Sequence, residues 1–289
     1  MDTILKVKGL SKKYNDFYLH HINFELKHGS ITGFIGENGA GKSTTIQSIL
    51  NIIDYDSGEI LFNGEFFGRN RNDLKKRIGY VGDNNKFYDD VKLKVIRDFV
   101  KDAYSEYWDE KFSEYLIRDL FNLKLDMKIK ELSKGTRAKF SLALAMSHNP
   151  DLLILDEPTS GLDPIVRNQL LEILNELAQQ KGTTIFFSSH ITDDIEKIAQ
   201  KIIYLDNGSI LLNEEKDIIF NRFKKISIDK INSAQIDKLK EIGVLVQGYI
   251  VLDEQELKKQ KIYNLNLEKV VLDEVLLLLK KQKRNNRME

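Results

Sequence analysis

The chain has 289 residues, of which 42% are apolar, and this is enough to bury the core of one full domain and of a smaller second one. Its 44 lysine and arginine residues balance 44 aspartate and glutamate residues, so no net charge draws it to nucleic acid or anionic lipid. The lack of cysteine excludes disulfide bonds and thiolate metal sites. No uninterrupted apolar run exceeds five residues, whereas a membrane-spanning helix needs about 20, so we expect neither a membrane span nor a secretion signal.

The first part of the chain has the pattern of strands that lead into a glycine-rich loop. Residues 4–8 alternate apolar and polar side chains and end at Gly9, and residues 21–26 repeat the pattern. Residues 31–35 form a short apolar run directly before the loop. Residues 44–53 then carry apolar side chains at helical spacing, which predicts a strand–loop–helix unit.

A helical segment is predicted next, inserted into an α/β core. Long charged stretches at residues 95–104 and 110–123 favour helices, and we place this helical subdomain at about residues 84–148. A helix is expected near residues 136–147. The apolar strand of residues 152–155 then returns the chain to the core.

The remaining pattern sets the fold class and the domain boundary. A helix near residues 164–180 precedes a strand at 183–187, and strands that alternate with helices imply a mixed, mostly parallel sheet covered on both faces. Residues 1–220 are therefore predicted to be one α/β domain. Residues 221–289 are predicted to be a small α+β appendage, with strands at 225–228 and 244–252 and a final helix at 267–283.

Residues 36–43 read G-E-N-G-A-G-K-S, which fits the phosphate-loop pattern between a strand and a helix. Backbone N–H groups of such a loop surround phosphate oxygens, and the next helix points its positive end at the same anion. Lys42 would contact the β and γ phosphates of ATP, and the Ser43 hydroxyl would bind Mg²⁺. A glycine-rich turn without a ligand is the alternative. The expected phosphate contacts are Gly36, Asn38, Gly39, Ala40, Gly41, Lys42, Ser43 and Thr44.

Two carboxylates, Asp156 and Glu157, follow the apolar strand of residues 152–155. Open α/β sheets bind ligands at the carboxyl ends of their strands. Asp156 is expected to hold Mg²⁺, and Glu157 to take a proton from the water that attacks the γ-phosphate. By themselves such paired acids are often solvated turn residues, and the phosphate loop upstream is what favours a catalytic role.

Further motifs make the sequence resemble the ATP-binding-cassette (ABC) family, over roughly residues 3–220. Residues 132–136, L-S-K-G-T, resemble the family's signature L-S-G-G-Q, and we call them the signature segment. Residues 160–163, S-G-L-D, match its D-loop, His190 matches its switch histidine, and Tyr14 stands where the family has an aromatic residue that stacks on adenine. Phe17 and Tyr18 lie nearby, and a core role for Tyr14 is the alternative.

The resemblance implies a P-loop NTPase fold and a head-to-tail dimer that holds two ATP molecules. Ser133 and Gly135 of one chain would contact the γ-phosphate of a nucleotide held by the other chain. Asp163 would communicate across the interface, and His190 would steady the γ-phosphate and the attacking water. A packing or surface role is the alternative for a lone histidine of this kind.

Two segments depart from the family pattern. The family has a glutamine after residues 78–82, where this chain has Asp83, an expected third Mg²⁺ ligand whose reach is one methylene shorter. The signature segment carries Lys134 and Thr136 in place of glycine and glutamine. Because Ser133 and Gly135 are kept, we expect activity.

Two surfaces could bind partners. The resemblance implies that residues 84–108 receive a membrane subunit, with a groove formed by aromatic side chains or, alternatively, with those side chains filling the segment's own core. These side chains are Phe87, Tyr88, Tyr104, Tyr107 and Trp108. Basic residues near the end of the chain could touch anionic lipid or simply favour the carboxyl end of a helix. They are Lys280, Lys281, Lys283, Arg284 and Arg287.

The expected function is therefore that of an ABC ATPase subunit that uses ATP and Mg²⁺. Its expected partners are a separate membrane permease and a second cassette, either a copy of itself or a paralogue, at the cytoplasmic face of the membrane. The signature and the short appendage look like those of Gram-positive exporters of antimicrobial or toxic peptides, including phenol-soluble modulins. An importer ATPase is one alternative. A soluble ABC ATPase acting on ribosomes or DNA is another, although nucleic acid is not an expected partner because the chain has one cassette and no net basic charge.

Overall fold

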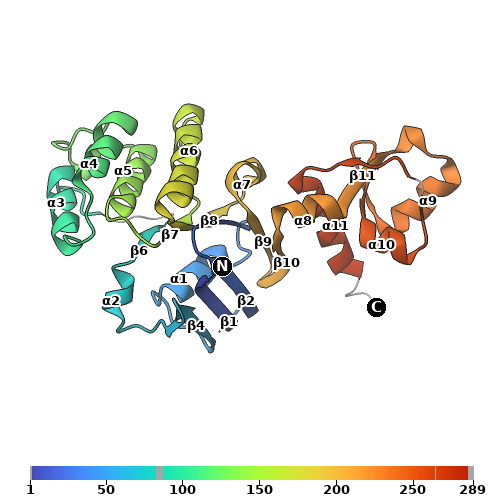
Figure 1. Cartoon of the computed structure of the whole chain (residues 1–289), viewed down its shortest axis with the longest axis horizontal. Helices are drawn as coiled ribbons and strands as arrows, with labels where there is room; N and C mark the ends of the chain where they lie inside the picture. Colours follow the sequence, from blue (N-terminus) through green and yellow to red (C-terminus); the bar gives the residue numbers. More distant parts are fainter. Residues whose placement is uncertain (1, 83–86, 264, 286–289) are drawn as a thin grey trace. The chain divides into compact units, whose positions relative to one another are not determined.

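The computed structural model of the chain describes residues 2–82, 87–263 and 265–285. Asp83, an expected metal ligand, and Arg287 lie outside these residues. The chain divides into two compact units between Leu212 and Asn213 (Figure 1), and the sequence pattern had placed this boundary at residue 220. We describe each unit separately.

A six-stranded sheet in the described part of the first unit has the order β10-β9-β3-β8-β7-β6. The strands are β3 (Ile31–Ile35), β6 (Ile78–Val81), β7 (Leu152–Asp156), β8 (Thr184–Ser189), β9 (Lys201–Asp206) and β10 (Ser209–Glu215), which continues past the boundary after Leu212. All neighbours from β9 to β6 pair in parallel, and every residue of β3, β7 and β8 is buried, as expected for strands covered on both faces. Ile35 pairs with Ser189, and Asp156 pairs with Ser188. The carboxyl ends of these strands therefore meet at one edge.

An antiparallel sheet of the order β2-β1-β4-β5 also belongs to the described part of this unit. Its strands are β1 (Thr3–Lys13), β2 (Tyr18–Lys27), β4 (Ser57–Phe62) and β5 (Glu65–Phe66). Gly9 does not end the first strand, as its place in the sequence suggested. It has a φ of 60° and sits at a register shift between Val7 and Leu10, and its N–H donates to the Asn23 side chain at 2.8 Å. Gly9 is thus a bulge that lets β1 continue.

Aromatic packing joins the two sheets of the first unit. Phe186 of β8 stacks on Phe34 of β3 at 5.0 Å and on Phe24 of β2 at 5.3 Å between ring centroids. All three rings are buried, and each contributes about 1.5–3 kcal/mol on burial. Helices α1 (Lys42–Ile49), α2 (Asn72–Lys75), α6 (Pro164–Lys181) and α7 (Thr192–Ile198) complete the α/β core.

The predicted helical segment lies between β6 and β7, where Figure 1 shows α3, α4 and α5 side by side. Its helices are α3 (Leu93–Ala103), α4 (Glu110–Glu114), a π-helical turn (Tyr115–Leu120), a short 3₁₀ helix (Ile129–Glu131) and α5 (Lys134–Met146). The helix predicted at residues 110–123 is thus interrupted by the π-helical turn, and it ends before Asn122, whose φ is 49°. Tyr104 stacks on buried His148 at 4.1 Å and joins the end of α3 to the chain that enters β7.

The second unit is α+β, with a described antiparallel sheet of the order β12-β13-β11-β14. Its elements are α8 (Lys216–Arg222), β11 (Phe223–Ser227), a 3₁₀ turn (Ile228–Lys230), α9 (Ser233–Ile242), β12 (Val244–Val246), β13 (Tyr249–Asp253), α10 (Glu254–Lys259), β14 (Glu268–Lys269) and α11 (Leu272–Asn285). Its small core is Ile226, Leu239, Ile250, Leu252 and Leu257.

Two boundaries in the second unit differ from the sequence prediction. Residues 244–252, predicted as one strand, form the β12–β13 hairpin, because Gln247 and Gly248 adopt φ angles of 46° and 83° and turn the chain back. The final helix begins at Leu272 instead of residue 267, because residues 268–269 pair with β11.

No helix in the described residues combines the length and the apolar character that crossing a membrane requires.

Candidate nucleotide site

The phosphate loop, residues 36–43, connects β3 to α1 and is held closely on two sides. At Gly41, φ is 107° and an added Cβ would lie 2.5 Å from Cζ of Phe17. At Gly36, an added Cβ would lie 2.6 Å from the carbonyl oxygen of Leu205. Glycine is therefore required at both positions because the neighbouring atoms leave no room for a side chain. Glu37, Asn38 and Gly39 are exposed at the crest of the loop, where a ligand could reach them.

Lys42, the first residue of α1, lies at the centre of the site with only 6% of its side chain exposed. Its ammonium donates to the carbonyl oxygens of Gly36 at 2.7 Å and Glu37 at 3.3 Å, and it lies 3.1 Å from Oε1 of Glu157. The first turn of α1 carries no acidic residue, so the positive end of this helix is not neutralised there. The arrangement suits a polyanion.

The carboxyl end of β7 presents the two carboxylates. Asp156 is buried, and its Oδ1 accepts a 2.6 Å hydrogen bond from the hydroxyl of Ser188. The same hydroxyl accepts from the N–H of Glu157 at 3.0 Å. Ser188 therefore orders both acids. No sequence motif marks this role, and the position of Ser188 at the end of β8, level with Asp156, is the signal that could have found it.

Glu157 bridges Lys42 and the predicted switch histidine. Its Oε2 lies 2.7 Å from Nδ1 of His190 and accepts from the His190 backbone N–H at 3.3 Å. Glu157 has a left-handed backbone with φ of 54°, which is uncommon for a side chain of this kind. This turn carries the carboxylate from the end of β7 to both partners. The predicted catalytic residues Lys42, Glu157 and His190 are thus brought together.

Hard oxygen donors fit a Mg²⁺ ion at this edge of the sheet. Ser43 has an exposed hydroxyl, and Asp156 supplies a carboxylate. The ion pair between their neighbours Lys42 and Glu157 brings these two stretches of chain together. Mg²⁺ is usually bound by one or two such protein groups together with substrate phosphates and water, so the donor set suits it.

The signature segment and the D-loop form a second cluster. Ser133 caps α5, and its side chain accepts from the N–H of Thr136 at 3.1 Å and contacts the Thr136 hydroxyl at 2.8 Å. Thr136 therefore closes the cap in a chain that lacks the family's glutamine. An added Cβ at Gly135 would lie 2.9 Å from the carbonyl oxygen of Gly161, so the two segments touch.

Asp163 caps α6 and faces the same cluster. Its Oδ1 accepts from the N–H of Val166 at 3.0 Å, and Lys139 of α5 lies 3.4 Å from its Oδ2. The Val166 N–H and, to a smaller extent, Lys139 hold the pKa of Asp163 below its usual range. Asp163 is therefore a charged group on the exposed side of this cluster.

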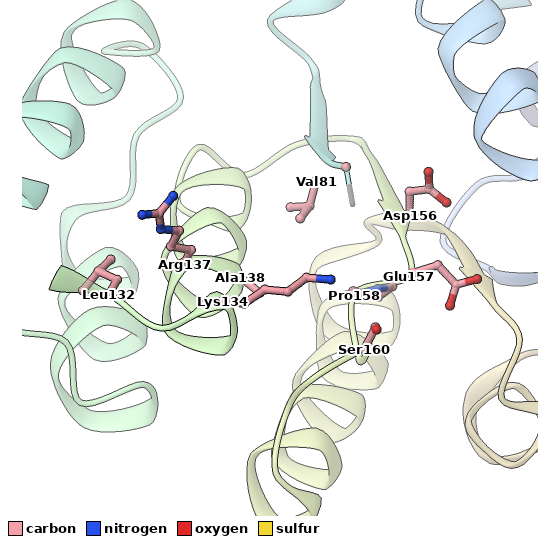
Figure 2. A pocket seen from close by; sticks show the side chains of 10 residues that line it. Val81, Leu132, Lys134, Arg137, Ala138, Asp156, Glu157, Pro158 and Ser160 are labelled. Atoms are coloured by element: carbon pink, nitrogen blue, oxygen red, sulfur yellow. The ribbon is translucent and has the colours of Figure 1, made fainter. Parts of the chain in front are cut away.

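A cavity of about 390 Å³ lies between the signature segment and the carboxylates Asp156 and Glu157. Figure 2 shows the Lys134 side chain extending from the start of α5 toward the segment that holds Glu157, Pro158 and Ser160. The cavity is lined by Val81, Gly82, Leu132, Lys134, Arg137, Ala138, Asp156, Glu157, Pro158 and Ser160.

Tyr14 lies in a turn beside the phosphate loop. Its N–H donates to the carbonyl of Phe17 at 2.7 Å, and Phe17 is the residue that packs under Gly41. The Tyr14 ring is 45% exposed, with the Lys12 ammonium 5.4 Å from its centroid. Phe17 is thus the packing residue, whereas Tyr14 is partly exposed, with Lys12 over its ring.

The five aromatic residues of the predicted groove divide into two groups. Phe87, Tyr104 and Trp108 are partly buried within the helical segment, as the alternative interpretation expected. Tyr88 is 85% exposed and Tyr107 is 36% exposed. Two further apolar side chains on α3, Val95 and Phe99, are exposed and were not predicted from the sequence.

Comparison with known proteins identifies the family. A sequence profile described as ABC transporter matches residues 19–160. The bacitracin transport ATP-binding protein BcrA of Bacillus licheniformis is 34% identical over 73% of this chain and 69% of its own length. The ABC transporter ATP-binding protein YtrB of Bacillus subtilis (strain 168) is 31% identical over 72% of this chain and 70% of its own length.

Solved structures agree with this assignment. A structure described as the ATP-binding subunit of an ABC transporter is 30% identical and superposes with a TM-score of 0.68, over 75% of this chain and 92% of that chain. A dimeric ATP-binding cassette bound to ADP and phosphate, 22% identical with a TM-score of 0.64, covers 73% of this chain and 98% of that chain and supports the fold. This chain therefore belongs to the ABC transporter family, as an ATP-binding and ATP-hydrolysing subunit.

Proposed function

We propose that this subunit hydrolyses ATP at the cluster of Lys42, Glu157 and His190 and thereby drives the export of a peptide, toxin or antimicrobial compound through a separate membrane permease. The observation that supports it most strongly is the position of Glu157, whose two carboxylate oxygens contact Lys42 and His190. The proposed base and the proposed phosphate-binding cation are thus in contact in one chain.

In the proposed reaction a water oxygen attacks the γ-phosphorus, the bond from phosphorus to the β–γ bridging oxygen breaks, and ADP leaves. Lys42 contacts the phosphates and so gives up its contact with Glu157, which is then available to accept the proton of the water. His190 retains its contact with Glu157 and orients both the Glu157 carboxylate and the attacking water. Ser43, Asp156 and Asp83 would hold Mg²⁺, which would supply positive charge to the phosphate oxygens when bound. Residues 36–44 bind the phosphates, and Tyr14 stacks on adenine.

A second cassette completes each site in this proposal. Ser133 and Gly135 lie at the amino-terminal end of α5, whose first turn carries no acidic residue, so this end favours an anion such as the γ-phosphate of a partner's nucleotide. Asp163 and the 71% exposed Ile165 lie at the start of α6, on a surface that dimerisation would cover. A copy of this chain and a paralogous cassette are both compatible with this surface.

The membrane partner is proposed to contact the exposed apolar side chains Tyr88, Val95, Phe99 and Tyr107 of the helical segment. This contact would hold the subunit at the cytoplasmic face of the membrane. The proposed role in transport is supported by similarity to a relative whose name gives bacitracin transport as its function.

The experiment compares ATP turnover by the purified chain, by Glu157→Gln and by Glu172→Gln, alone and with membranes from its own cell. Glu172 is an exposed acid of α6 and serves as a matched control. We expect Glu157→Gln to abolish turnover and to accumulate an ATP-bound dimer, whereas Glu172→Gln behaves as the wild type. Unchanged turnover by Glu157→Gln would refute the proposed base. Turnover that responds to ribosomes or DNA, and not to membranes, would refute the transport role.

A further inference from the structure

A buried ion pair joins α6 to α7 beside the proposed site. Both Nε and a terminal nitrogen of Arg167 lie 2.7 Å from the same oxygen, Oδ1, of Asp194. The Asp194 side chain is fully buried, and 27% of the Arg167 side chain is exposed. The other carboxylate oxygen, Oδ2, is buried without a hydrogen-bond partner among the described residues.

This geometry is a poor design for stability alone. Burial of a carboxylate requires strong compensation, and a buried oxygen left without a donor costs about 1–3 kcal/mol. An apolar contact of the same size would hold two helices together as well or better. The pair therefore calls for another explanation.

The positions of the two residues give that explanation. Arg167 lies four residues after Asp163, and its N–H donates to the Asp163 carbonyl oxygen at 2.9 Å. Asp194 lies four residues after His190. The ion pair therefore ties the chain that carries the predicted dimer-contacting acid to the chain that carries the predicted switch histidine.

Helix α7 depends on tertiary contacts for its position, because seven residues are too few to form a stable helix in isolation. Its apolar side is fixed by Ile195, whose side chain fills the space beside Gly33, since a Cβ added there would lie 2.4 Å from Ile195. Arg167–Asp194 fixes the side that faces α6. A second α6–α7 contact, from Lys197 to Asn168 at 3.2 Å, is exposed.

We propose that Arg167 and Asp194 form a positioning pair for the hydrolysis reaction: they set α7 so that His190 stays against Glu157, and they link that contact to Asp163. This inference rests on the proposed function. Neither residue touches the nucleotide in this proposal, so their effect is transmitted through His190.

The test compares Asp194→Asn and Arg167→Met with the conservative variant Asp194→Glu and with the control Lys197→Met, which removes only the exposed contact. A misplacement of about 1 Å at a catalytic group can reduce a rate by up to about 100-fold. We therefore expect kcat to fall about 10- to 100-fold in Asp194→Asn and Arg167→Met, with KM for ATP within about twofold of wild type. Asp194→Glu is expected to recover most of kcat, and Lys197→Met to leave it unchanged.

A second measurement separates positioning from folding. The C2–H proton resonance of His190, assigned with His190→Gln and read at one fixed pH, is expected to shift in Asp194→Asn and not in Lys197→Met. The chain has five histidines, so the resonance can be resolved. A lowered melting temperature with unchanged kcat and an unchanged His190 resonance, measured well below melting, would overturn the proposal. If Asp194→Asn does not fold, the double variant Arg167→Met/Asp194→Leu takes its place, with the same expectations for kcat and the resonance.

The two proposals fail in different ways. Turnover by the wild type that does not depend on Glu157 refutes the proposed function. Turnover that depends on Glu157 but is insensitive to the buried pair refutes only this inference.

Discussion

The buried titratable side chain of His148 stands between the last turn of α5 and the start of β7, where the helical segment rejoins the core. Only 3% of this residue is exposed, and its ring stacks on Tyr104. Burial lowers the pKa of His148 below its ordinary value of 6.5, because the charged imidazolium loses its hydration. The contact between the helical segment and the core therefore favours the neutral form of the His148 ring.

The stability of the first unit should consequently depend on pH through this residue. Since the folded pKa of His148 is lowered, the unfolded chain binds more protons below pH 6.5, and stability falls as the pH drops through the interval between 6.5 and the lower folded value. Melting followed from about pH 7.5 to about pH 5.5 should show this loss, and His148→Phe should reduce it while retaining the ring contact. An equal loss of stability in the wild type and in His148→Phe would show that His148 does not cause the pH dependence.

Helix ends are fixed by specific side chains in both units. Ser133 and Asp163 cap the amino-terminal ends of α5 and α6. In the second unit, the Lys281 ammonium of α11 donates to the carbonyl oxygens of Lys240 and Gly243, both at 2.6 Å, at the carboxyl end of α9. Lys281, one of the basic residues near the end of the chain, therefore satisfies helix carbonyls. This favours a structural role for it over contact with lipid.

Removal of the Lys281 cap should destabilise the second unit. We expect Lys281→Met to lower its free energy of unfolding by about 1 kcal/mol, because two partly exposed hydrogen bonds to helix carbonyls are lost. Lys238→Met, on the exposed side of α9, retains the cap and should leave stability nearly unchanged. Denaturant unfolding of the full chain, monitored by hydrogen exchange of α9 amides, measures the stability of both variants.

Every described residue assigned to the nucleotide lies before Leu212, in the first of the two compact units. Anything that binds only the folded state stabilises it by mass action, by about 2.7 kcal/mol at a ligand concentration of 100 Kd. Since the second unit has its own core, its local opening need not follow that of the first.

Nucleotide should therefore protect the two units unequally. In Glu157→Gln, which retains the ligand, hydrogen exchange with ATP is expected to slow for amides of β3, α1 and β7 and to change little for β11 and β13. Equal slowing in both units would show that the second unit responds to the nucleotide, and would contradict the expectation.

The sequence predicted what depends on local pattern and missed what depends on contact between distant segments. The run of residues 31–35 coincides with β3, because a short buried strand shows as a continuous apolar run. The α/β fold class and the family are confirmed. The hairpin at residues 244–253 was missed, because its turn needs a left-handed conformation at Gln247, and glutamine is not a residue that indicates such a turn. Ser188 was missed because its role appears only once β7 and β8 pair in register. The chemical roles of the individual site residues stay predictions.

The left-handed backbone of Glu157 links the stability of the chain to its proposed activity. A glutamate held in this conformation costs about 1–3 kcal/mol, and glycine would adopt the same φ of 54° without strain while leaving the N–H bond to Ser188 in place. The same substitution would remove the proposed base and leave the buried Lys42 ammonium without its carboxylate partner, a loss that opposes the relief of strain. Once ATP phosphates contact Lys42, as proposed, this opposing loss disappears. Glu157→Gly should therefore gain more thermal stability from a non-hydrolysable ATP analogue than the wild type does, which melting with and without the analogue measures.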